Sequence, residues 1–578
     1  MSGFDLVIRG GTVVDGRGGE PFIADVGIRN GLIAEVGVIA AKGRDEIDAT
    51  GLLVTPGWVD IHTHYDGQAT WDERITPSSI HGATTVVMGN CGVGFAPVRK
   101  SDHDTLIRLM EGVEDIPGAA LHEGLNWTWE SFPQYLDALE RKPHDIDIVA
   151  HLPHGALRVY VMGERGANRE PATKAEIAQM GRLAKEAVEA GAIGFSSSRT
   201  MLHRTSDGQP TPTLGAAREE LLGIAKGLGE AGKGVLQFVS DFTDTQEEFD
   251  MLRELAATSG RPLSFSLLQN DVRPDQWQEL LAQLDGAVKS GITMRGQVSA
   301  RPVGLLLGLQ GSLNPFITRP SYVAIAGKPL AERVAIMRDP AFRARLLAEE
   351  NDKGHPFSMM VGSAYGKMFE LGDPPNYEPA PEESLAARAA RQGRAPDELV
   401  YDVLLAEEGR GFIYFPLLNY AHFDLEAARK MLCDANTVPG LSDGGAHCGV
   451  ICDGSFPTYM LTHWARDRTR GEKLPLPWIV KAQAQDTARA VGLLDRGVIA
   501  PGYKADVNVI DFDRLQLKPP HMVYDLPSGA RRLMQEAIGY VATIASGEII
   551  YREGLPTGAL PGKLVRGHQP APVQRAAE

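Results

Sequence analysis

The stretch VTPGWVDIHTHYDG, residues 54–67, contains the pattern on which the predicted fold depends. An apolar run follows the turn at Pro56 and Gly57 and ends in His62 and His64. A spacing of two residues puts both imidazoles on the same side of a β-strand. Two imidazoles on one side of a strand can bind a single metal ion. The alternative interpretation is a pair of solvent-facing histidines at a strand edge. The stretch therefore predicts an early buried strand that ends in two metal ligands.

Outward from this strand, short apolar runs alternate with helical stretches such as KAEIAQMGRLAKEAVEAG (174–191). The β-rich runs are TTVVMGN (84–90), DIDIVAHL (145–152), AIGFSSS (192–198), GVLQFVSD (234–241), PLSFSLL (262–268) and GFIYFPL (411–417). This alternation predicts βα units around a parallel sheet that is covered on both faces. We therefore expect an α/β protein with a closed, TIM-like (β/α) barrel. A doubly wound sheet is less favoured because no GxGxxG follows a predicted strand.

The two ends of the chain share a different sequence pattern, in which short runs of alternating apolar and polar residues are separated by Gly-rich turns. This pattern predicts a small antiparallel sheet. Residues 1–58 and 491–560 are expected to combine into one small β-domain beside a barrel of residues 59–490. The segment at about 300–410 is rich in Pro, Gly and charge and is interpreted as an insertion in the barrel. Residues 561–578 have the composition of a C-terminal tail.

Composition and charge exclude several classes of protein. The chain has 578 residues, 43% of them hydrophobic and 23% charged, and no apolar stretch approaches the roughly 18 residues that span a bilayer. A net charge of −16 without a dense Lys/Arg cluster argues against a nucleic-acid partner. The N-terminal residues show no export signal, and four cysteines are too few for a disulfide framework. We expect a cytoplasmic protein with a small-molecule substrate and no membrane partner, and homo-oligomerisation stays open.

Two further candidate ligands follow other predicted strands. Cys91 lies in the Gly-rich turn of GNCGVGFAP (89–97), where a thiolate could bind a metal and a buried inert thiol is the alternative. Asp443 lies in LSDGGAH (441–447), where the glycines let loop backbone and substrate approach the carboxylate. An Asx-turn aspartate is the alternative there. Taken singly, each structural alternative is favoured.

Together these segments resemble the amidohydrolase superfamily, and within it the N-acyl-D-amino-acid deacylase (D-aminoacylase)-like branch. The resemblance covers nearly the whole chain and rests on DLVIRGGTVVDG (5–16), VTPGWVDIHTHYDG (54–67), GNCGVGFAP (89–97), HGALR (154–158), AIGFSSS (192–198), LSDGGAH (441–447) and GVIAPGYKADVNVID (497–511). It implies a (β/α)8 barrel, a β-sandwich built from both termini, and zinc at the barrel mouth. It also implies that His62, His64, Cys91 and Asp443 form the metal site, with Asp443 as the catalytic residue.

Several stretches depart from the pattern of that branch. Its deacylases carry one metal-binding histidine at the end of strand five and another at strand six, whereas GVLQFVSDF (234–242) and PLSFSLLQND (262–271) contain none. Strand four, AIGFSSSRT (192–200), lacks the lysine that other amidohydrolases carboxylate into a bridging ligand. We therefore expect one zinc ion rather than two. Four ligands on one tetrahedral ion would leave no position for water, so either Cys91 or Asp443 stays uncoordinated or the site expands to five ligands.

Three polar residues near the predicted barrel mouth are candidates for substrate binding. Ser198 lies at the end of the fourth strand, His203 follows it, and His447 follows Asp443 closely. A histidine there could orient the aspartate or donate to a substrate carbonyl, and a purely structural role is the alternative for each.

The substrate carboxylate has no evident partner. In the branch it is held by a basic residue after strand six and by an arginine downstream of the catalytic aspartate. The corresponding stretches, LLQND (267–271) and GGAHCGVICDGSFPTYMLTHW (444–464), contain neither. A desolvated anion needs charge-assisted donors, so we expect a neutral or larger substrate.

The predicted reaction is hydrolysis of a non-peptide C–N bond in an amide or cyclic amide. A metal at His62 and His64 would lower the pKa of water toward about 7, and Asp443 would take its proton and pass it to the departing nitrogen. Two alternatives stay open. The same site could act on an ester, a lactone or a C–C bond beside a carbonyl, or the chain could be a metal-free, degenerate amidohydrolase that acts as a binding protein.

Overall fold

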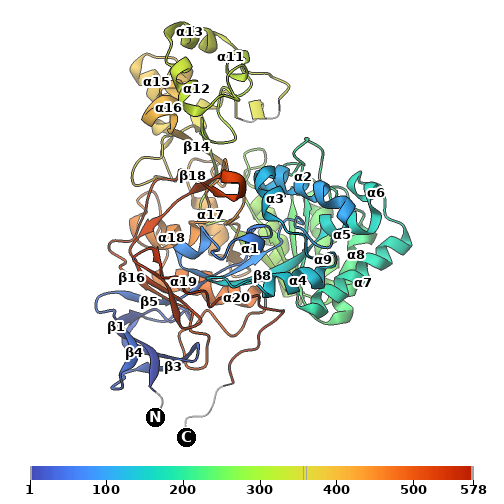
Figure 1. Ribbon diagram of the computed structural model, residues 1–578, viewed down its shortest axis with the longest axis vertical. Helices are drawn as coiled ribbons and strands as arrows, with labels where there is room; N and C mark the ends of the chain where they lie inside the picture. The colour runs from blue at the N-terminus through green and yellow to red at the C-terminus, as the bar shows by residue number, and fades with distance from the viewer. Residues whose placement is uncertain (1–2, 356, 359–360, 574–578) are drawn as a thin grey trace.

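Strand β6 (Trp58–Asp60), which leads into the two histidines, begins an eight-stranded parallel sheet. The computed structural model describes residues 3–355, 357–358 and 361–573. After β6 the sheet continues in the order β7 (Ala83–Met88), β8 (Asp147–Pro153), β9 (Gly194–Arg199), β10 (Val235–Ser240), β11 (Leu263–Ser266), β12 (Met294–Val298) and β15 (Thr437–Pro439). This curled parallel sheet confirms the predicted α/β class and barrel (Figure 1).

The two edge strands of this sheet meet at the end where the histidines lie. Residues just past β15 bend toward the end of β6, where Asp443 N–H donates to His62 O at 3.1 Å and His64 N–H donates to Gly444 O at 2.8 Å. A parallel bridge joins Thr63 to Gly444 between these two hydrogen bonds. The closure of the barrel is therefore also what brings Asp443 beside the two histidines.

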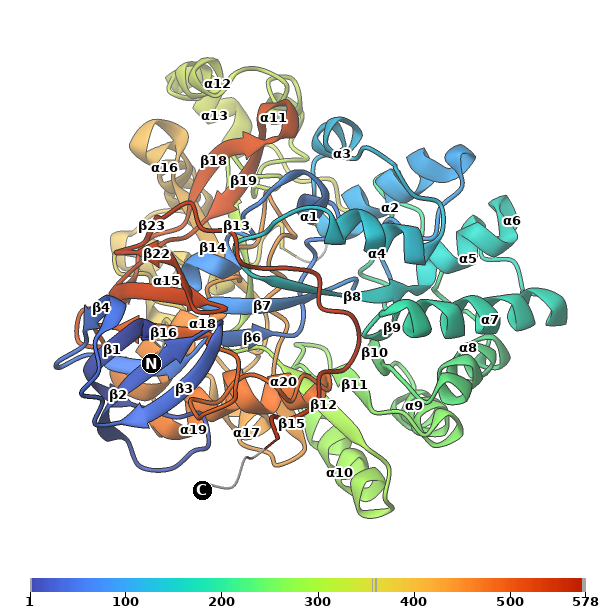
Figure 2. The same ribbon diagram turned by 60° about the horizontal axis from the view of Figure 1, so that its bottom comes forward.

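Helices cover the outside of the barrel (Figure 2). They include α7 (Lys174–Ala190), α8 (Arg218–Ala231), α9 (Thr245–Ser259) and α10 (Gln276–Lys289). Helix α7 begins in a capping box, in which Thr173 Oγ1 accepts from Glu176 N–H and the Glu176 carboxylate accepts from Thr173 N–H. Its buried side chains, among them Met180, Ala184 and Ala187, recur at helical spacing and face the sheet. No helix within the described ranges is both long and apolar enough to cross a membrane.

One predicted barrel strand lies elsewhere. GFIYFPL forms β14 (Phe412–Leu418), which pairs antiparallel with β13 (Val303–Gly308) in a separate two-stranded sheet, so its assignment to the barrel was wrong. Ile413 and Phe415 on one face of β14 join one hydrophobic core, and Tyr414 on the other face joins the core of the barrel. A strand that is buried on both faces has the same continuous apolar sequence whether it is parallel or antiparallel.

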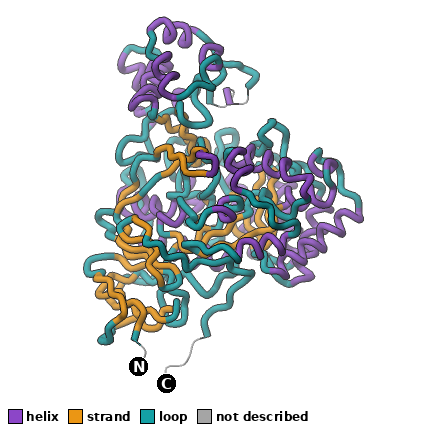
Figure 3. Tube along the Cα trace, viewed as in Figure 1, coloured by secondary structure: helices purple, strands orange, loops and turns teal. Residues whose placement is uncertain are grey.

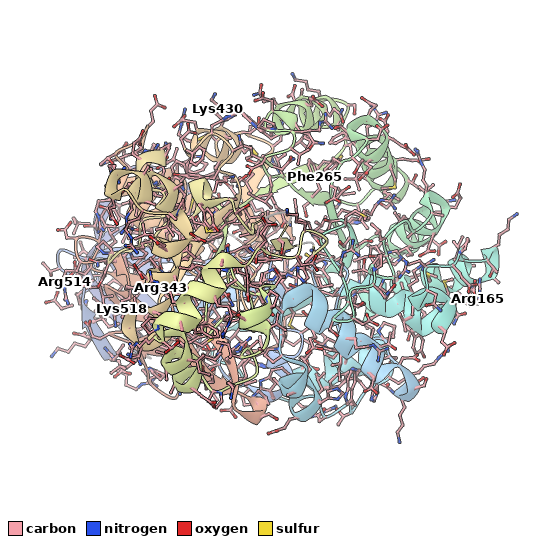
Figure 4. All side chains as sticks on the ribbon, turned by 90° about the horizontal axis from the view of Figure 1, so that it is seen from above. Arg165, Phe265, Arg343, Lys430, Arg514 and Lys518 are labelled. Carbon is pink, nitrogen blue, oxygen red and sulfur yellow. The ribbon has the colours of Figure 1, made fainter. Side chains whose placement is uncertain are left out.

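The β13–β14 pair is the base of a helical lobe formed by the predicted insertion. Its helices are α11 (Pro320–Val323), α12 (Leu330–Met337), α13 (Pro340–Ala348), α15 (Leu385–Gln392) and α16 (Pro396–Gly409), and they pack around a core of their own. The lobe stands at the top of Figure 1. In Figure 4, seen from above, Arg343 of the lobe lies between Arg514 and Lys518 on one side and Arg165 of the outer barrel helices on the other.

The two termini meet in a nine-stranded sheet, as the predicted β-domain requires (Figure 3). Its strands are β1 (Phe4–Val13), β2 (Phe22–Arg29), β3 (Leu32–Gly37), β4 (Gly43–Asp48), β5 (Leu53–Pro56), β16 (Val507–Ile510), β21 (Tyr540–Ala545), β22 (Glu548–Arg552) and β23 (Leu555–Pro556). The N-terminal and C-terminal parts join where β5 pairs with β16. The sheet is mixed rather than purely antiparallel, because β4 and β5 both run parallel to β1.

A buried ion-pair cluster connects the barrel to this terminal sheet. Asp147 on β8 contacts Arg496 at 2.7 Å and Lys504 at 2.9 Å, both in the segment that leads into β16. Burial alone would raise the pKa of Asp147, but the charges of Lys504 and Arg496 outweigh burial and hold that pKa at about 2. The stabilisation is therefore present above the ordinary aspartate pKa of 3.8 and is lost as the pH falls from there toward 2.

Replacing Asp147 by alanine is expected to destabilise the protein by about 1–3 kcal/mol, because the buried cations Arg496 and Lys504 each lose one carboxylate partner and keep another. The measurement is the urea midpoint of unfolding at pH 7. The matched control is Asp137→Ala, which removes an exposed carboxylate 2.7 Å from Arg566. A surface pair of this kind contributes about 0–1 kcal/mol. Equal midpoints for the two variants would contradict the assigned role of Asp147.

Candidate active site

The predicted ligands after β6 and after β7 lie together at the C-terminal end of the barrel strands. His62, His64 and Cys91 are all buried, and their ligand atoms lie within 4.8 Å of one another. The shortest contact joins His62 Nε2 to Cys91 Sγ at 3.3 Å. All four cysteines of the chain are free, so the Cys91 sulfur is available as a ligand.

Asp443 completes this cluster from the other side of the barrel closure. Its Oδ1 lies 3.4 Å from His62 Nε2 and 3.5 Å from His64 Nε2. Ligand atoms of a tetrahedral zinc ion, at bond lengths of about 2.0–2.3 Å, are separated by about 3.3–3.6 Å. Asp443 Oδ1 and both ring nitrogens of His64 are buried and have no hydrogen-bond partner among the described residues. Buried polar atoms normally have partners, so these orphaned atoms fit a metal ion between them.

The His62 ring is held in one tautomer by Gln297 on β12. Gln297 Nε2 donates to Ser264 Oγ at 2.9 Å, so its Oε1 is the atom that faces His62 Nδ1, at 2.8 Å. A carbonyl oxygen only accepts, so Nδ1 carries the proton and Nε2 keeps a free lone pair. Burial lowers the pKa of His62 to about 4. The ring is therefore neutral at pH 7, as a metal ligand must be.

The His64 ring faces a carboxylate instead. Glu114, the last residue of α2 (His103–Glu114), places its Oε1 3.2 Å from His64 Nδ1. Burial lowers the pKa of His64, but the negative charges of Glu114 and Asp443 outweigh it and raise that pKa above its ordinary value. Neither Glu114 nor Gln297 follows from a sequence motif, because each lies far along the chain from the histidine that it contacts.

Two of the candidate ligands sit in strained backbone. Cys91 has a φ of 55° and Asp443 a φ of 47°, in the left-handed region where a side chain costs about 1–3 kcal/mol. Gly445, with a φ of 90°, has no room for a side chain, since an added Cβ would lie 3.0 Å from His64 O. Both turns are therefore held in costly conformations, as is common where side chains must point at a ligand.

The site is electrostatically negative. In the part of the chain that the structure describes, Asp443 and Glu114 form ion contacts with histidines and with no lysine or arginine. Burial raises the pKa of Asp443, but its contacts with His447 and His64 lower that pKa by more than burial raises it. The pKa of Asp443 therefore lies well below its usual range. Burial and the nearby carboxylates raise the pKa of the Cys91 thiol. A divalent cation would compensate the carboxylates and ionise the thiol.

The three residues predicted to bind substrate have different surroundings. Ser198 Oγ and His203 Nδ1 share a hydrogen bond of 2.9 Å. Among the described residues, neither of them hydrogen-bonds or ion-pairs with the four candidate ligands. His447 Nε2 lies 3.7 Å from Asp443 Oδ2, so His447 is part of the cluster. Substrate binding by these three residues stays a prediction.

The remaining motif residues build the scaffold around Cys91. In HGALR, His154 contacts Ser197 at 2.8 Å and Glu220 at 2.9 Å, in a buried network that lies outside the ligand cluster. In AIGFSSS, Ser196 Oγ accepts from Gly92 N–H at 3.1 Å and donates to the carbonyl of Gly89. These hydrogen bonds fix the Gly-rich turn that presents the Cys91 thiol.

Comparison with known proteins agrees with this fold. Residues 45–551 match the Amidohydrolase family. D-aminoacylase of Alcaligenes xylosoxydans xylosoxydans is 26% identical over 567 residues, which cover 97% of each chain. N-acyl-D-glutamate deacylase of the same organism is 27% identical over 571 residues, 97% of this chain and 96% of that one. A crystal structure of N-acyl-D-glutamate deacylase from Bordetella bronchiseptica, with zinc and a phosphonate inhibitor, has a TM-score of 0.64 at 22% identity and covers 98% of this chain and 100% of that chain.

The family match extends from the terminal sheet through the whole barrel to β22, and the two deacylases align with nearly the full length of the chain. This confirms the resemblance that the sequence motifs indicate, and the substrate is accordingly a small molecule. The chain belongs to the Amidohydrolase family and is a metal-dependent hydrolase of carbon–nitrogen bonds other than peptide bonds.

Proposed function

We propose that His62 and His64, together with Asp443, Cys91 or both, bind one zinc ion that keeps a position open for water, and that the chain uses it to hydrolyse the amide bond of an N-acylated D-amino-acid derivative. The observation that carries the proposal is the convergence of His62 Nε2 with Cys91 Sγ and Asp443 Oδ1, at 3.3 and 3.4 Å. Thiolate and imidazole donors favour zinc over magnesium or calcium, which prefer oxygen ligands. The two deacylases that align with the full chain support the bond type.

One ion is proposed rather than two because the next strands offer no further strong ligand. On β10, Gln237 Oε1 accepts from Cys91 N–H at 3.2 Å, and on β11 the polar residues are Ser264 and Ser266. Neutral amide and hydroxyl groups are poor substitutes for histidine at a zinc site. In the described ranges, no second group of His, Cys, Asp or Glu side chains comes close enough together to hold an ion.

When bound, zinc lowers the pKa of a coordinated water and polarises the substrate carbonyl. Asp443 accepts the proton of the attacking water and delivers it to the departing nitrogen. Contact with His447 helps to keep the Asp443 carboxylate ionised and so able to accept that proton. Gln297 keeps the proton of His62 on Nδ1, away from the reaction.

The substrate is proposed to lack a free carboxylate. After β11, Gln269 bonds to Ala421 N–H and Asn270 accepts from the backbone of its own loop, and neither carries charge. The arginine that follows β12, Arg301, is buried and paired with Asp453 at 2.9 Å. Among the described residues of these two stretches, a substrate anion would meet no unpaired cation, and a charged group left without a partner costs about 1–3 kcal/mol or more.

A matched substrate pair tests this specificity. With N-acetyl-D-leucinamide, kcat/KM is expected to be at least about tenfold higher than with N-acetyl-D-leucine, which differs only in its free carboxylate. Initial rates for both compounds, measured with the same zinc-loaded enzyme, give the ratio. A higher value for the free acid would contradict the proposed neutral substrate while leaving amide hydrolysis intact. Turnover of the matching ester or lactone but of neither amide would favour the alternative reaction class.

A further inference from the structure

Glu114 is a buried carboxylate that faces two imidazoles, one with each oxygen. Its side chain is 1% exposed, and Oε1 lies 3.2 Å from His64 Nδ1 while Oε2 lies 3.7 Å from His447 Nε2. In the part of the chain that the structure describes, Oε1 accepts no hydrogen bond, although it lies within ion-pair distance of His64 Nδ1. Each carboxylate oxygen of Glu114 therefore faces one imidazole nitrogen.

These contacts close into a ring beside the proposed zinc site. His64 Nε2 lies 3.5 Å from Asp443 Oδ1, and His447 Nε2 lies 3.7 Å from Asp443 Oδ2. Two carboxylates thus alternate with two imidazoles. The main chain fixes the same arrangement, since His447 N–H donates to the carbonyl oxygen of Glu114. Movement of Glu114 would therefore disturb both histidines at once.

Local stability does not explain a glutamate at this position. Glu114 ends α2, where the partial negative charge of the helix disfavours an acidic side chain. A buried carboxylate also costs several kcal/mol unless it is compensated. Over the described residues its ion contacts are to His64 and His447 and to no lysine or arginine. A cation bound through His64 would supply the missing compensation.

We propose that Glu114 is a positioning residue, which holds His64 through Nδ1 so that Nε2 faces the zinc ion, and which fixes His447 beside Asp443. This rests on the proposed zinc site. A carboxylate on the far nitrogen of a ligating histidine sets its tautomer and raises its basicity toward the metal. Gln297 sets the tautomer of His62 as a neutral acceptor. Of the two histidine ligands, His64 is therefore the one whose far nitrogen faces a negative charge.

The test is Glu114→Gln, which preserves shape and removes the charge. Zinc affinity, measured by competition with a chromogenic chelator, is expected to fall about 10–100-fold. The visible spectrum of the cobalt-substituted variant is expected to shift, and kcat is expected to fall more than KM rises. The matched control is Asp145→Asn, because Asp145 is also a buried carboxylate but lies before β8, at the opposite end of the barrel strands from the ligands, where it accepts from Ile75 N–H and Tyr551 OH. The control is expected to retain wild-type zinc affinity and cobalt spectrum.

Imidazole nitrogen resonances of the ¹⁵N-histidine-labelled wild-type protein provide a second measurement that does not depend on whether the variant folds. Zinc-loaded protein is expected to show His64 protonated at Nδ1 and bound to metal through Nε2. The opposite tautomer would overturn the proposal, as would a folded Glu114→Gln variant with unchanged zinc affinity. With either result, the proposed function would still hold if the wild-type protein binds zinc. Wild-type protein that takes up no zinc would overturn the proposed function itself.

Discussion

Replacing His62 by asparagine is expected to leave the purified protein almost free of zinc and to lower kcat/KM by about 10⁴-fold or more. The reason is geometric, since His62 Nε2 is the atom that lies closest to both Cys91 Sγ and Asp443 Oδ1. Removing it takes one ligand from the centre of the cluster. Zinc content by mass spectrometry and amide hydrolysis, both measured on protein purified without chelator, give the two effects.

The control for this variant is His144→Asn, which changes another buried histidine. His144 contacts the carbonyl of Ala69 at 3.0 Å and lies before β8, at the opposite end of the barrel strands from the ligands. It is expected to retain zinc and turnover. Normal zinc content in the His62 variant would contradict the proposed ligand set, and normal turnover without zinc would contradict the proposed use of the ion.

Asp443→Asn is expected to lower kcat by about 10²–10⁴-fold while zinc remains bound. An asparagine oxygen can replace Oδ1 beside His62 and His64, but an amide cannot accept and return a proton. Measuring zinc content and kcat on the same preparation therefore separates the proton-transfer role of Asp443 from its ligand role. Near-normal turnover with normal zinc content would show that another group transfers the proton.

Much of the fold follows from pattern alone. The apolar run that ends at His62 and His64 predicts the first barrel strand, and the alternating ends of the chain predict the shared terminal sheet. Cys91 and Asp443 were each favoured as structural residues when taken singly. Their approach to the histidines depends on barrel closure, which joins residues more than 370 positions apart along the chain, such as Thr63 and Gly444.

The seventh and eighth barrel strands could not be predicted from an apolar run. β12 reads MRGQV, with an arginine, a glycine and a glutamine, and β15 has only three residues. Each is recognisable as a strand only through its neighbours in the closed sheet. The most convincing apolar run in this region, β14, belongs to the lobe, because burial on both faces leaves the same pattern in either setting.

The residues that orient the ligands carry no sequence signature of their own. Gln297 lies inside β12, which has no apolar run, and Glu114 ends an amphipathic helix whose apolar face packs against the core. Their roles depend on distances to His62 and His64 that only the assembled barrel defines. By contrast, the sequence itself shows that strands five and six contain no histidine, and this is the reason for expecting a single ion.

The most direct test of the proposed zinc site is anomalous diffraction from a zinc-loaded crystal, with data collected on both sides of the zinc absorption edge. We expect one peak, within about 2.0–2.3 Å of His62 Nε2 and His64 Nε2 and bonded to Asp443, Cys91 or both. Two peaks of comparable height, or a single peak away from His62 and His64, would contradict it.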